Sequence, residues 1–161
     1  MCKNKTLLTD VIFHTLGEMF PTKTSQQAAL KYPKAYNVEH LVEIALSKLG
    51  GYEFVDEEGY DFTDLSDSKT CSVNASDQSV VISSVENKIG ALRIVVYNYH
   101  KKALDFLFVP KDCVRKECEP CYGKQQTKLK LRCRYNAKTD SYNKFEKYRV
   151  KDFETLAKLS G

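Results

Sequence analysis

The sequence predicts an α/β (α+β) fold in which a central mixed β-sheet is flanked by helices. Two patterns indicate it: apolar residues recur at helical spacing in the N-terminal third, and they alternate with polar residues through the middle of the chain. The chain has 161 residues, of which 42% are hydrophobic and 29% charged, and this suits one compact domain with its own core. With only 7 glycines and 4 prolines, it is not typical of a disordered or collagen-like chain.

Two longer helices are expected ahead of the sheet, with a shorter helical stretch over residues 25–31 between them. The first covers residues 7–19, where large apolar side chains recur every three or four positions. The second covers residues 38–49 and has a continuous apolar stripe, with Asn37 as its N-cap. The pair Gly50 and Gly51 ends this helix, because glycine adopts the left-handed conformation of a helix C-terminus at little cost.

Alternation with a period of two then predicts the strands of the sheet. A turn at residues 56–59 joins residues 52–55 to residues 60–62 in a hairpin. The strands expected after the hairpin are residues 69–74, 80–85, 91–98 and 103–109.

The C-terminal third is expected to be built differently. Residues 113–127 have little apolar content and indicate a loop or knuckle. Residues 128–135 alternate without interruption, so one face of that strand is apolar and the other is cationic. Residues 142–150 are expected to be its antiparallel partner, which gives a basic β-ribbon, and Asp152 is expected to cap a last short helix.

Charge is distributed unevenly along the chain, although the net charge is only +4. Residues 53–67 include seven acidic side chains and no basic one, whereas residues 111–151 include thirteen basic and five acidic side chains. A dense basic surface favours a polyanion because binding releases counterions, and clustered carboxylates repel one another unless a cation neutralises them. The two regions together indicate a metal-dependent enzyme that acts on nucleic acid; the alternative is that both are solvated surface patches.

The acidic hairpin contains the residue types that phosphodiester hydrolysis requires. On a strand, Asp67 and Lys69 point to the same face, and Asp61 from the hairpin can meet them there, with Asp64 as an alternative to Asp61. Hydrolysis needs a Mg²⁺ held by two carboxylates and a positive group that orients or helps to deprotonate the attacking water. Asp61, Asp67 and Lys69 are therefore predicted to be catalytic, with Mg²⁺ bound by Asp61, or Asp64, and Asp67. The alternative is that the aspartates form turns and Lys69 makes an ordinary surface ion pair.

This segment resembles the PD-(D/E)XK nucleases, whose signature is an Asp on one strand, followed on the next by Asp or Glu, any residue, and Lys. Asp61 takes the place of the first acid, and Asp67-Ser68-Lys69 forms the second half of the signature. The order of elements over residues 38–112 is similar too, and it is most similar to small type II restriction endonucleases. The resemblance implies a restriction-endonuclease-like core and a Mg²⁺-dependent, sequence-specific endonuclease of double-stranded DNA.

The cysteines suggest a second metal. Six cysteines in a chain expected to be intracellular argue against a disulfide framework. Cys118 and Cys121 form a CxxC pair, and Cys113 and Cys133 flank it at spacings that can close a tetrahedral four-thiolate site. A structural Zn²⁺ is expected there; the alternative is a set of reduced thiols, with Cys133 on the packed face of its strand.

The basic ribbon is the expected DNA-binding surface. A two-stranded ribbon can enter a major groove or follow a phosphate backbone, and the alternative is a solvated charged strand. The predicted contact residues are Lys128, Lys130, Arg132 and Arg134 on the first strand and Lys144, Lys147 and Arg149 on its partner.

We expect a single nuclease domain over residues 1–161. Within it, residues 1–36 are a helical dimerisation region, residues 37–112 the catalytic core, and residues 113–161 the cysteine knuckle, basic ribbon and final helix. Cutting both DNA strands with one site per subunit requires a homodimer, and the helix over residues 7–19 is the expected interface.

The absence of a long apolar run and of a secretory pattern predicts a cytoplasmic (intracellular) protein without a membrane partner. Two other function classes fit the same sequence. One is a non-catalytic, zinc-stapled DNA-binding protein, in which the acidic hairpin is only surface. The other is a protein-binding regulator of phage or mobile-element origin, whose charged regions dock a charged partner.

Overall fold

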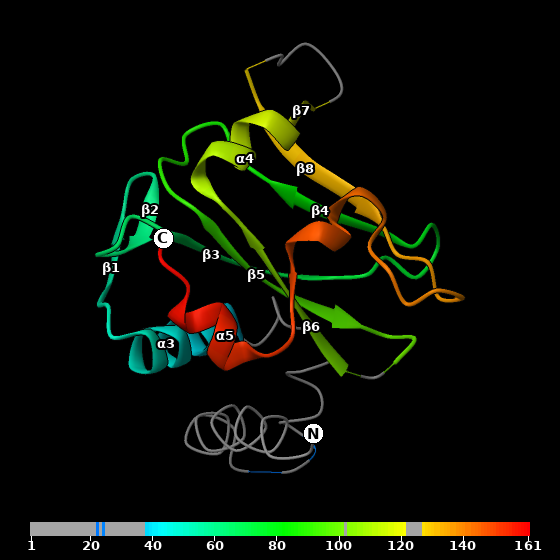
Figure 1. Cartoon of the computed structure of the whole chain (residues 1–161), viewed down its shortest axis with the longest axis horizontal. Coiled ribbons are helices and arrows are strands. Elements are labelled where there is room, and N and C mark those ends of the chain that lie inside the picture. The colour runs from blue at the N-terminus through cyan, green and yellow to red at the C-terminus, as the bar shows by residue number, and fades with distance from the viewer. Residues whose placement is uncertain (1–21, 23, 25–37, 102, 122–126) are drawn as a thin grey trace.

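The computed structural model describes residues 22, 24, 38–101, 103–121 and 127–161, which form three β-sheets and several short helices (Figure 1). The α+β class expected from the sequence is confirmed. The helix expected over residues 7–19, with its role in dimerisation, the shorter stretch over residues 25–31 and the N-cap Asn37 all lie outside the described residues. Within the described ranges, no helix is long and apolar enough to span a membrane.

The central sheet has four strands in the order β3-β5-β6-β9. β3 runs parallel to β5, whereas β5 and β6, and β6 and β9, are antiparallel, so the sheet is mixed as expected. β3 is the last strand on its side, which leaves one of its edges to the acidic hairpin. The four strands are β3 (Asp67–Ser72), β5 (Leu92–Asn98), β6 (Ala103–Val109) and β9 (Arg149–Val150).

Further elements cover both faces of the central sheet (Figure 1). Helices α3 (Val38–Gly50) and α5 (Phe153–Lys158) pack together on one face, and a second sheet of order β4-β8-β7 packs on the other. The hairpin β1-β2 lies next to the start of β3. The remaining bounds are β1 (Phe54–Glu57), β2 (Tyr60–Phe62), β4 (Ser79–Ser83), α4 (Lys111–Glu117), β7 (Glu119–Pro120), β8 (Leu129–Arg134) and the 3₁₀ helix η2 (Asn143–Tyr148).

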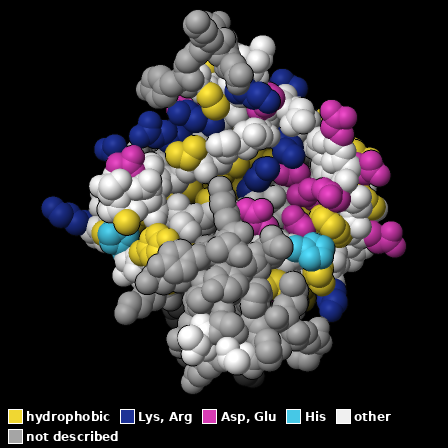
Figure 2. Space-filling view, turned by 180° about the vertical axis from the view of Figure 1, so that it is seen from behind, with side chains coloured by type: hydrophobic (Ala, Val, Ile, Leu, Met, Phe, Trp, Pro, Cys, Tyr) yellow, Lys and Arg dark blue, Asp and Glu magenta, His cyan; other side chains and the backbone are white. Residues whose placement is uncertain are grey.

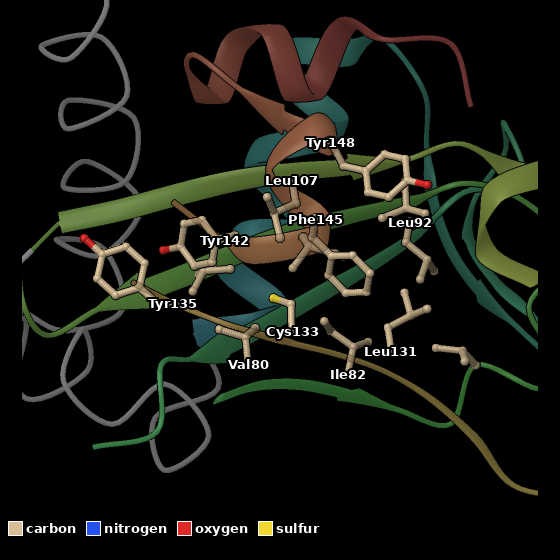
Figure 3. Close-up of a cluster of buried hydrophobic side chains, with 14 of the residues drawn as sticks. Val80, Ile82, Leu92, Leu107, Leu131, Cys133, Tyr135, Tyr142, Phe145 and Tyr148 are labelled. Carbon is tan, nitrogen blue, oxygen red and sulfur yellow. The ribbon is translucent and has the colours of Figure 1, made fainter. Parts of the chain in front are cut away.

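The core lies on both sides of the central sheet because its two middle strands are apolar on each face. Val95 and Phe106 pack against α3 and α5, whereas Ile94 and Leu107 pack against the second sheet. Figure 3 shows this second cluster, in which side chains of β4, β5, β6, β8 and η2 meet. Full burial of such a side chain contributes roughly 1.5–3 kcal/mol. The two clusters thus join three layers: the helices α3 and α5, the central sheet and the second sheet.

Helices α3 and α5 begin and end much as the sequence predicts. The stripe of α3 is buried through Leu41, Val42 and Ala45, and Gly51 follows it with a φ of +78°. The Asp152 carboxylate accepts a hydrogen bond from the backbone N–H of Thr155, which confirms the predicted cap of α5.

The predicted pairing of the basic ribbon is wrong. β8 pairs with β4 and β7, and the segment expected to be its partner forms η2 and β9 instead. The reason is visible in the aromatic residues Tyr142, Phe145 and Tyr148, which recur every three positions and are all buried. A spacing of three places side chains on one face of a 3₁₀ helix, so burying all three excludes an extended strand.

The expected loop over residues 113–127 begins as a helix. α4 covers its first part and ends at Glu117, and the buried Val114 attaches the helix to the core. Pro110 stands directly before α4, where the missing N–H of proline costs no helical hydrogen bond. The low apolar content of the segment therefore reflects a short, mostly exposed helix.

Arg93 of β5 is fully buried and ties three parts of the chain together. Its guanidinium donates hydrogen bonds to the Ser66 hydroxyl, to the Asp64 carboxylate, and to the backbone carbonyls of Leu156 and Leu159. The turn before β3 and the C-terminal end of α5 are thereby fixed to the central sheet. The same guanidinium lies over the rings of Tyr52 and Phe108.

We expect Arg93→Met to lower the free energy of unfolding by about 3–5 kcal/mol, because the substitution leaves Asp64 and two helix carbonyls without their buried donor. Urea denaturation followed by far-UV circular dichroism measures the loss. Arg134→Met, at an exposed position on β8, is the matched control and should change stability by less than about 0.5 kcal/mol. Equal effects of the two substitutions would contradict the structural role of Arg93.

Candidate active site

Asp67 and Lys69 lie on the same face of β3, as alternation on a strand predicts. They pair with Leu92 and Ile94 of β5, so they stand at the first and third positions of the parallel ladder. Lys69 Nζ lies 3.5 Å from Asp67 Oδ2, and the side chain of Asp67 is only 2% exposed. β3 thus holds a buried carboxylate beside a half-buried ammonium group.

Asp61 approaches Asp67 from the hairpin. Its Oδ2 accepts a hydrogen bond of 2.9 Å from the backbone N–H of Ser68, at the edge of β3 that faces away from β5. Burial and the neighbouring Asp67 raise the pKa of Asp61 to about 6, against the hydrogen bond from Ser68. The structure therefore brings Asp61, Asp67 and Lys69 together, and the charge of Asp67 adds to the effect of burial on Asp61.

Asp64, the alternative to Asp61, takes part in a different network. Its carboxylate accepts hydrogen bonds from the backbone and hydroxyl of Ser66 and pairs with Arg93 at 2.7 Å. Burial opposes its charge, but these donors outweigh burial and hold the pKa of Asp64 below its usual range. Asp64 thus serves the turn before β3, and Asp61 is the acid that lies beside Asp67.

Two residues at this site were missed by sequence reasoning. Lys88, in the loop between β4 and β5, donates a hydrogen bond of 2.9 Å to Asp67 Oδ1. Glu43 of α3 lies near Asp61, and its pKa rises to about 7, mainly through burial, with the charge of Asp61 adding to the rise and His40 opposing it. Neither residue has a local signal, because each reaches the site from an element distant in sequence. A charged residue next to the apolar stripe of α3 was the only available hint for Glu43.

The site offers two carboxylates to a metal ion, which is fewer than a centre built from protein ligands alone requires. Among the described residues, no three His, Cys, Asp or Glu side chains converge closely enough to hold a metal. Mg²⁺ requires less, because one or two carboxylates suffice when waters and substrate phosphates complete its shell. Asp61 and Asp67 supply two carboxylates, and the buried Asp67 Oδ2 has no hydrogen-bond partner among these residues. A buried carboxylate oxygen without a hydrogen-bond partner is stabilised by a cation or a water molecule that binds to it.

The four cysteines do not form such a centre within the described residues. Cys113 and Cys118 pack against the cluster of Figure 3, and Cys133 is buried inside it. Burial raises the pKa of Cys133 to about 12, which opposes the thiolate that zinc requires. In this arrangement Cys133 packs as an apolar side chain. The zinc site with Cys121 as its fourth ligand stays a prediction.

The cationic face of β8 is present, and acidic neighbours lie along it. Leu131 and Cys133 are buried, whereas Arg132 is half-buried and Arg134 is exposed on the opposite face. Arg132 lies 3.7 Å from Asp77. Just before the strand, Lys128 Nζ lies 3.2 Å from Glu86 Oε1. On the strand, Lys130 Nζ lies 4.0 Å from Glu119 Oε1.

The other three predicted DNA contacts are not on this face. Lys144 and Lys147 extend from η2, and Lys147 pairs with Glu117 of α4. Arg149 is bound within a network that includes the buried Asp105 and the exposed Asp140. Arg149 therefore supports the fold around Asp105, and the structure separates these three residues from the cations of β8.

Basic and acidic side chains adjoin on one face of the molecule. Figure 2 shows Lys and Arg side chains from the upper left toward the centre and Asp and Glu side chains to the right, with basic groups directly beside the acidic ones near the centre. Two hydrogen bonds connect β8 with the loop between β4 and β5. The N–H of Val85 donates to the carbonyl of Leu129, and the N–H of Leu129 donates to the carboxylate of Glu86. The start of β8 is thereby fixed to the loop that carries Lys88.

A scan against protein-family models, a search of curated proteins and a search of solved structures each found no match to this chain.

The pKa values predict how stability depends on pH when no metal is present. Glu43 and Asp61 ionise at higher pH in the folded than in the unfolded chain, so the folded state binds more protons between about pH 4 and 7. The protonated forms of Glu43 and Asp61 are the ones that the folded state favours. The stability that they contribute is therefore fully present below about pH 4 and is lost as the pH rises through 6 and 7. In EDTA, Glu43→Gln should therefore be more stable than wild type at pH 8 by about 1–3 kcal/mol, and close to it at pH 5.

Chemical denaturation in EDTA at the two pH values measures this difference. Glu57→Gln is the control, because Glu57 is exposed on the hairpin that carries Asp61, and it should leave the pH dependence of stability unchanged. A stability difference between Glu43→Gln and wild type that is the same at pH 5 and pH 8 would show that Glu43 does not change its protonation on folding.

Proposed function

We propose that the protein is a Mg²⁺-dependent, sequence-specific endonuclease of double-stranded DNA, similar to small type II restriction enzymes. One observation carries the proposal: Asp61 and Asp67 lie side by side with Lys69, and Asp67 is buried with one oxygen that has no hydrogen-bond partner among the described residues. A protein gains no stability from a buried carboxylate with a second, partly buried carboxylate beside it, so such a pair indicates a functional site. A homodimer supplies the two sites that a double-strand cut requires.

The residues have separate roles in this chemistry. Asp61 and Asp67 hold Mg²⁺, which neutralises charge on the phosphate in the transition state. Lys69 is more exposed than Asp67, so its ammonium group is available to orient the attacking water or to help deprotonate it. Glu43 adds a third carboxylate at the side of Asp61, where it accepts a proton near neutral pH.

The cations of β8 support a path for DNA toward this site. Glu86 is hydrogen-bonded to the N–H of Leu129 and paired with Lys128, and it precedes Lys88 by two residues. A phosphate backbone that follows Arg134, Arg132 and Lys130, in that order, therefore leads to the loop at Asp67. The pairs of Lys128 with Glu86 and of Arg132 with Asp77 are open to solvent and are worth about 0–1 kcal/mol each, so phosphates exchange for these acidic partners at little cost.

Lys69→Ala and Asp67→Asn should each reduce Mg²⁺-dependent cleavage of plasmid and phage DNA by about 10²- to 10⁴-fold, because each removes a group that acts on the reacting phosphate or water. Gel electrophoresis of the products, with Mg²⁺ or EDTA, measures cleavage, and a gel shift measures binding. Binding should be largely retained, and Glu57→Gln, an acidic residue of the same hairpin, should cleave as wild type does.

Each outcome of this experiment selects a function. Discrete fragments that depend on Mg²⁺ and disappear in both variants support the nuclease, and full activity of Lys69→Ala refutes the assignment. DNA that shifts on a gel without being cut favours the non-catalytic DNA-binding protein. A protein with no affinity for DNA at moderate salt favours the protein-binding regulator.

Arg132→Ala should weaken DNA binding and lower the slope of log K against log salt concentration by about 1, as expected for one lost phosphate contact. Fluorescence anisotropy with a labelled duplex at several salt concentrations measures both quantities. Lys158→Ala on α5 is the control, because Lys158 is exposed and pairs with Glu154 on the other side of the central sheet. An unchanged slope for Arg132→Ala would remove β8 from the DNA interface.

A further inference from the structure

Asp67 faces two ammonium groups, and they differ in how closely they bind it. Lys88 Nζ donates a hydrogen bond of 2.9 Å to Oδ1, whereas Lys69 Nζ lies 3.5 Å from Oδ2. The exposed fraction is 28% for the side chain of Lys69, 13% for Lys88 and 2% for Asp67. A buried carboxylate needs a partner of opposite charge, and in the metal-free protein that partner is Lys88.

The loop that carries Lys88 is held in place by the acidic hairpin. The N–H of Ile89 donates to the carbonyl of Gly59 in the hairpin turn. Gly90 passes so close to the turn before β3 that a Cβ at this position would lie 2.0 Å from the carbonyl oxygen of Leu65. The backbone of Lys88 is thus fixed relative to Asp67, so the ion pair is built into the fold.

Lys88 has two opposing effects on a metal ion at Asp67. Its hydrogen bond orients the carboxylate, and losing such a bond typically costs about 10- to 100-fold in metal affinity. Its charge also repels a divalent cation bound to the same carboxylate, and between partly buried charges a few ångströms apart this repulsion is the stronger effect. In the free protein, Lys88 therefore competes with the metal.

We infer that Lys88 is a built-in counter-ion of Asp67. Lys88 releases Asp67 when Mg²⁺ and a DNA phosphate bind together. The inference rests on the proposed function and adds a regulation of the same site. In the free protein the ammonium group neutralises Asp67, and divalent cations bind weakly. When DNA is present, a phosphate of the DNA pairs with the ammonium group of Lys88 in place of Asp67. Asp67 then becomes available to the metal. Metal loading is thereby coupled to substrate binding.

Titration of the free protein with Mn²⁺, followed by electron paramagnetic resonance, tests the competition. Lys88→Met and Lys88→Gln should bind Mn²⁺ about 10- to 100-fold more tightly than wild type, because the repelling charge is gone. Lys158→Met should bind as wild type does, since Lys158 is exposed and its partner is Glu154, not Asp67. Lys88→Gln keeps a hydrogen-bond donor for Asp67 and serves if Lys88→Met does not fold in EDTA.

The coupling to substrate is tested in a Lys69→Ala background, which keeps the DNA intact. A DNA duplex should raise the Mn²⁺ affinity of the protein with Lys88 by a larger factor than that of the Lys88→Gln protein, in which only the phosphate ligand is gained. Equal or weaker Mn²⁺ binding by folded Lys88→Gln overturns the inference and leaves the nuclease proposal standing if wild type still cuts DNA. Failure of every protein to bind Mn²⁺ at millimolar concentration, with and without DNA, overturns the proposed function and the inference together.

Discussion

The arrangement of this molecule depends on the buried guanidinium of Arg93. A charge without access to water is tolerated only where its donors are satisfied, and the partners of Arg93 come from the turn before β3 and from the end of α5. Because two of these partners are backbone carbonyls, α5 has to end where it does. The central strand β5, which carries Arg93, thus determines the positions of elements that precede and follow it by many residues.

The turn that Arg93 holds is also the one that brings the two acids of the site together. Ser66, which accepts a hydrogen bond from Arg93, presents its carbonyl to the backbone N–H groups of Asp61 and Phe62. This closes the chain between β2 and β3, so Asp61 cannot move away from Asp67 even though the two carboxylates repel each other. Burial, and after it the neighbouring Asp67, raise the pKa of Asp61 to about 6, so holding the two groups together costs stability once both are charged.

How much of this could be read from the sequence depends on how local each signal is. Alternation along β3 placed Asp67 and Lys69 on one face, and the apolar stripe with Gly51 defined α3, because both patterns involve only neighbouring residues. Glu43 and Lys88 could not be found in this way, since tertiary packing alone brings Glu43 near Asp61 and Lys88 to Asp67. The partner of β8 was assigned wrongly because proximity in sequence was given more weight than the spacing of three between buried aromatic residues in the following segment.

Burial separates the charges of this protein into two kinds. On β8, the pairs of Lys128 with Glu86 and of Arg132 with Asp77 lie at the surface, where water and salt weaken them, so they are readily exchanged for other partners. The pair of Lys88 with Asp67 is largely removed from water, where breaking it without a replacement is costly. A polyanion can therefore settle along β8 with little reorganisation, whereas the carboxylates are reached only when new charges replace the old ones. In the proposed nuclease, the surface that attracts DNA and the site that acts on it are thus separated by the energy needed to rearrange their ion pairs.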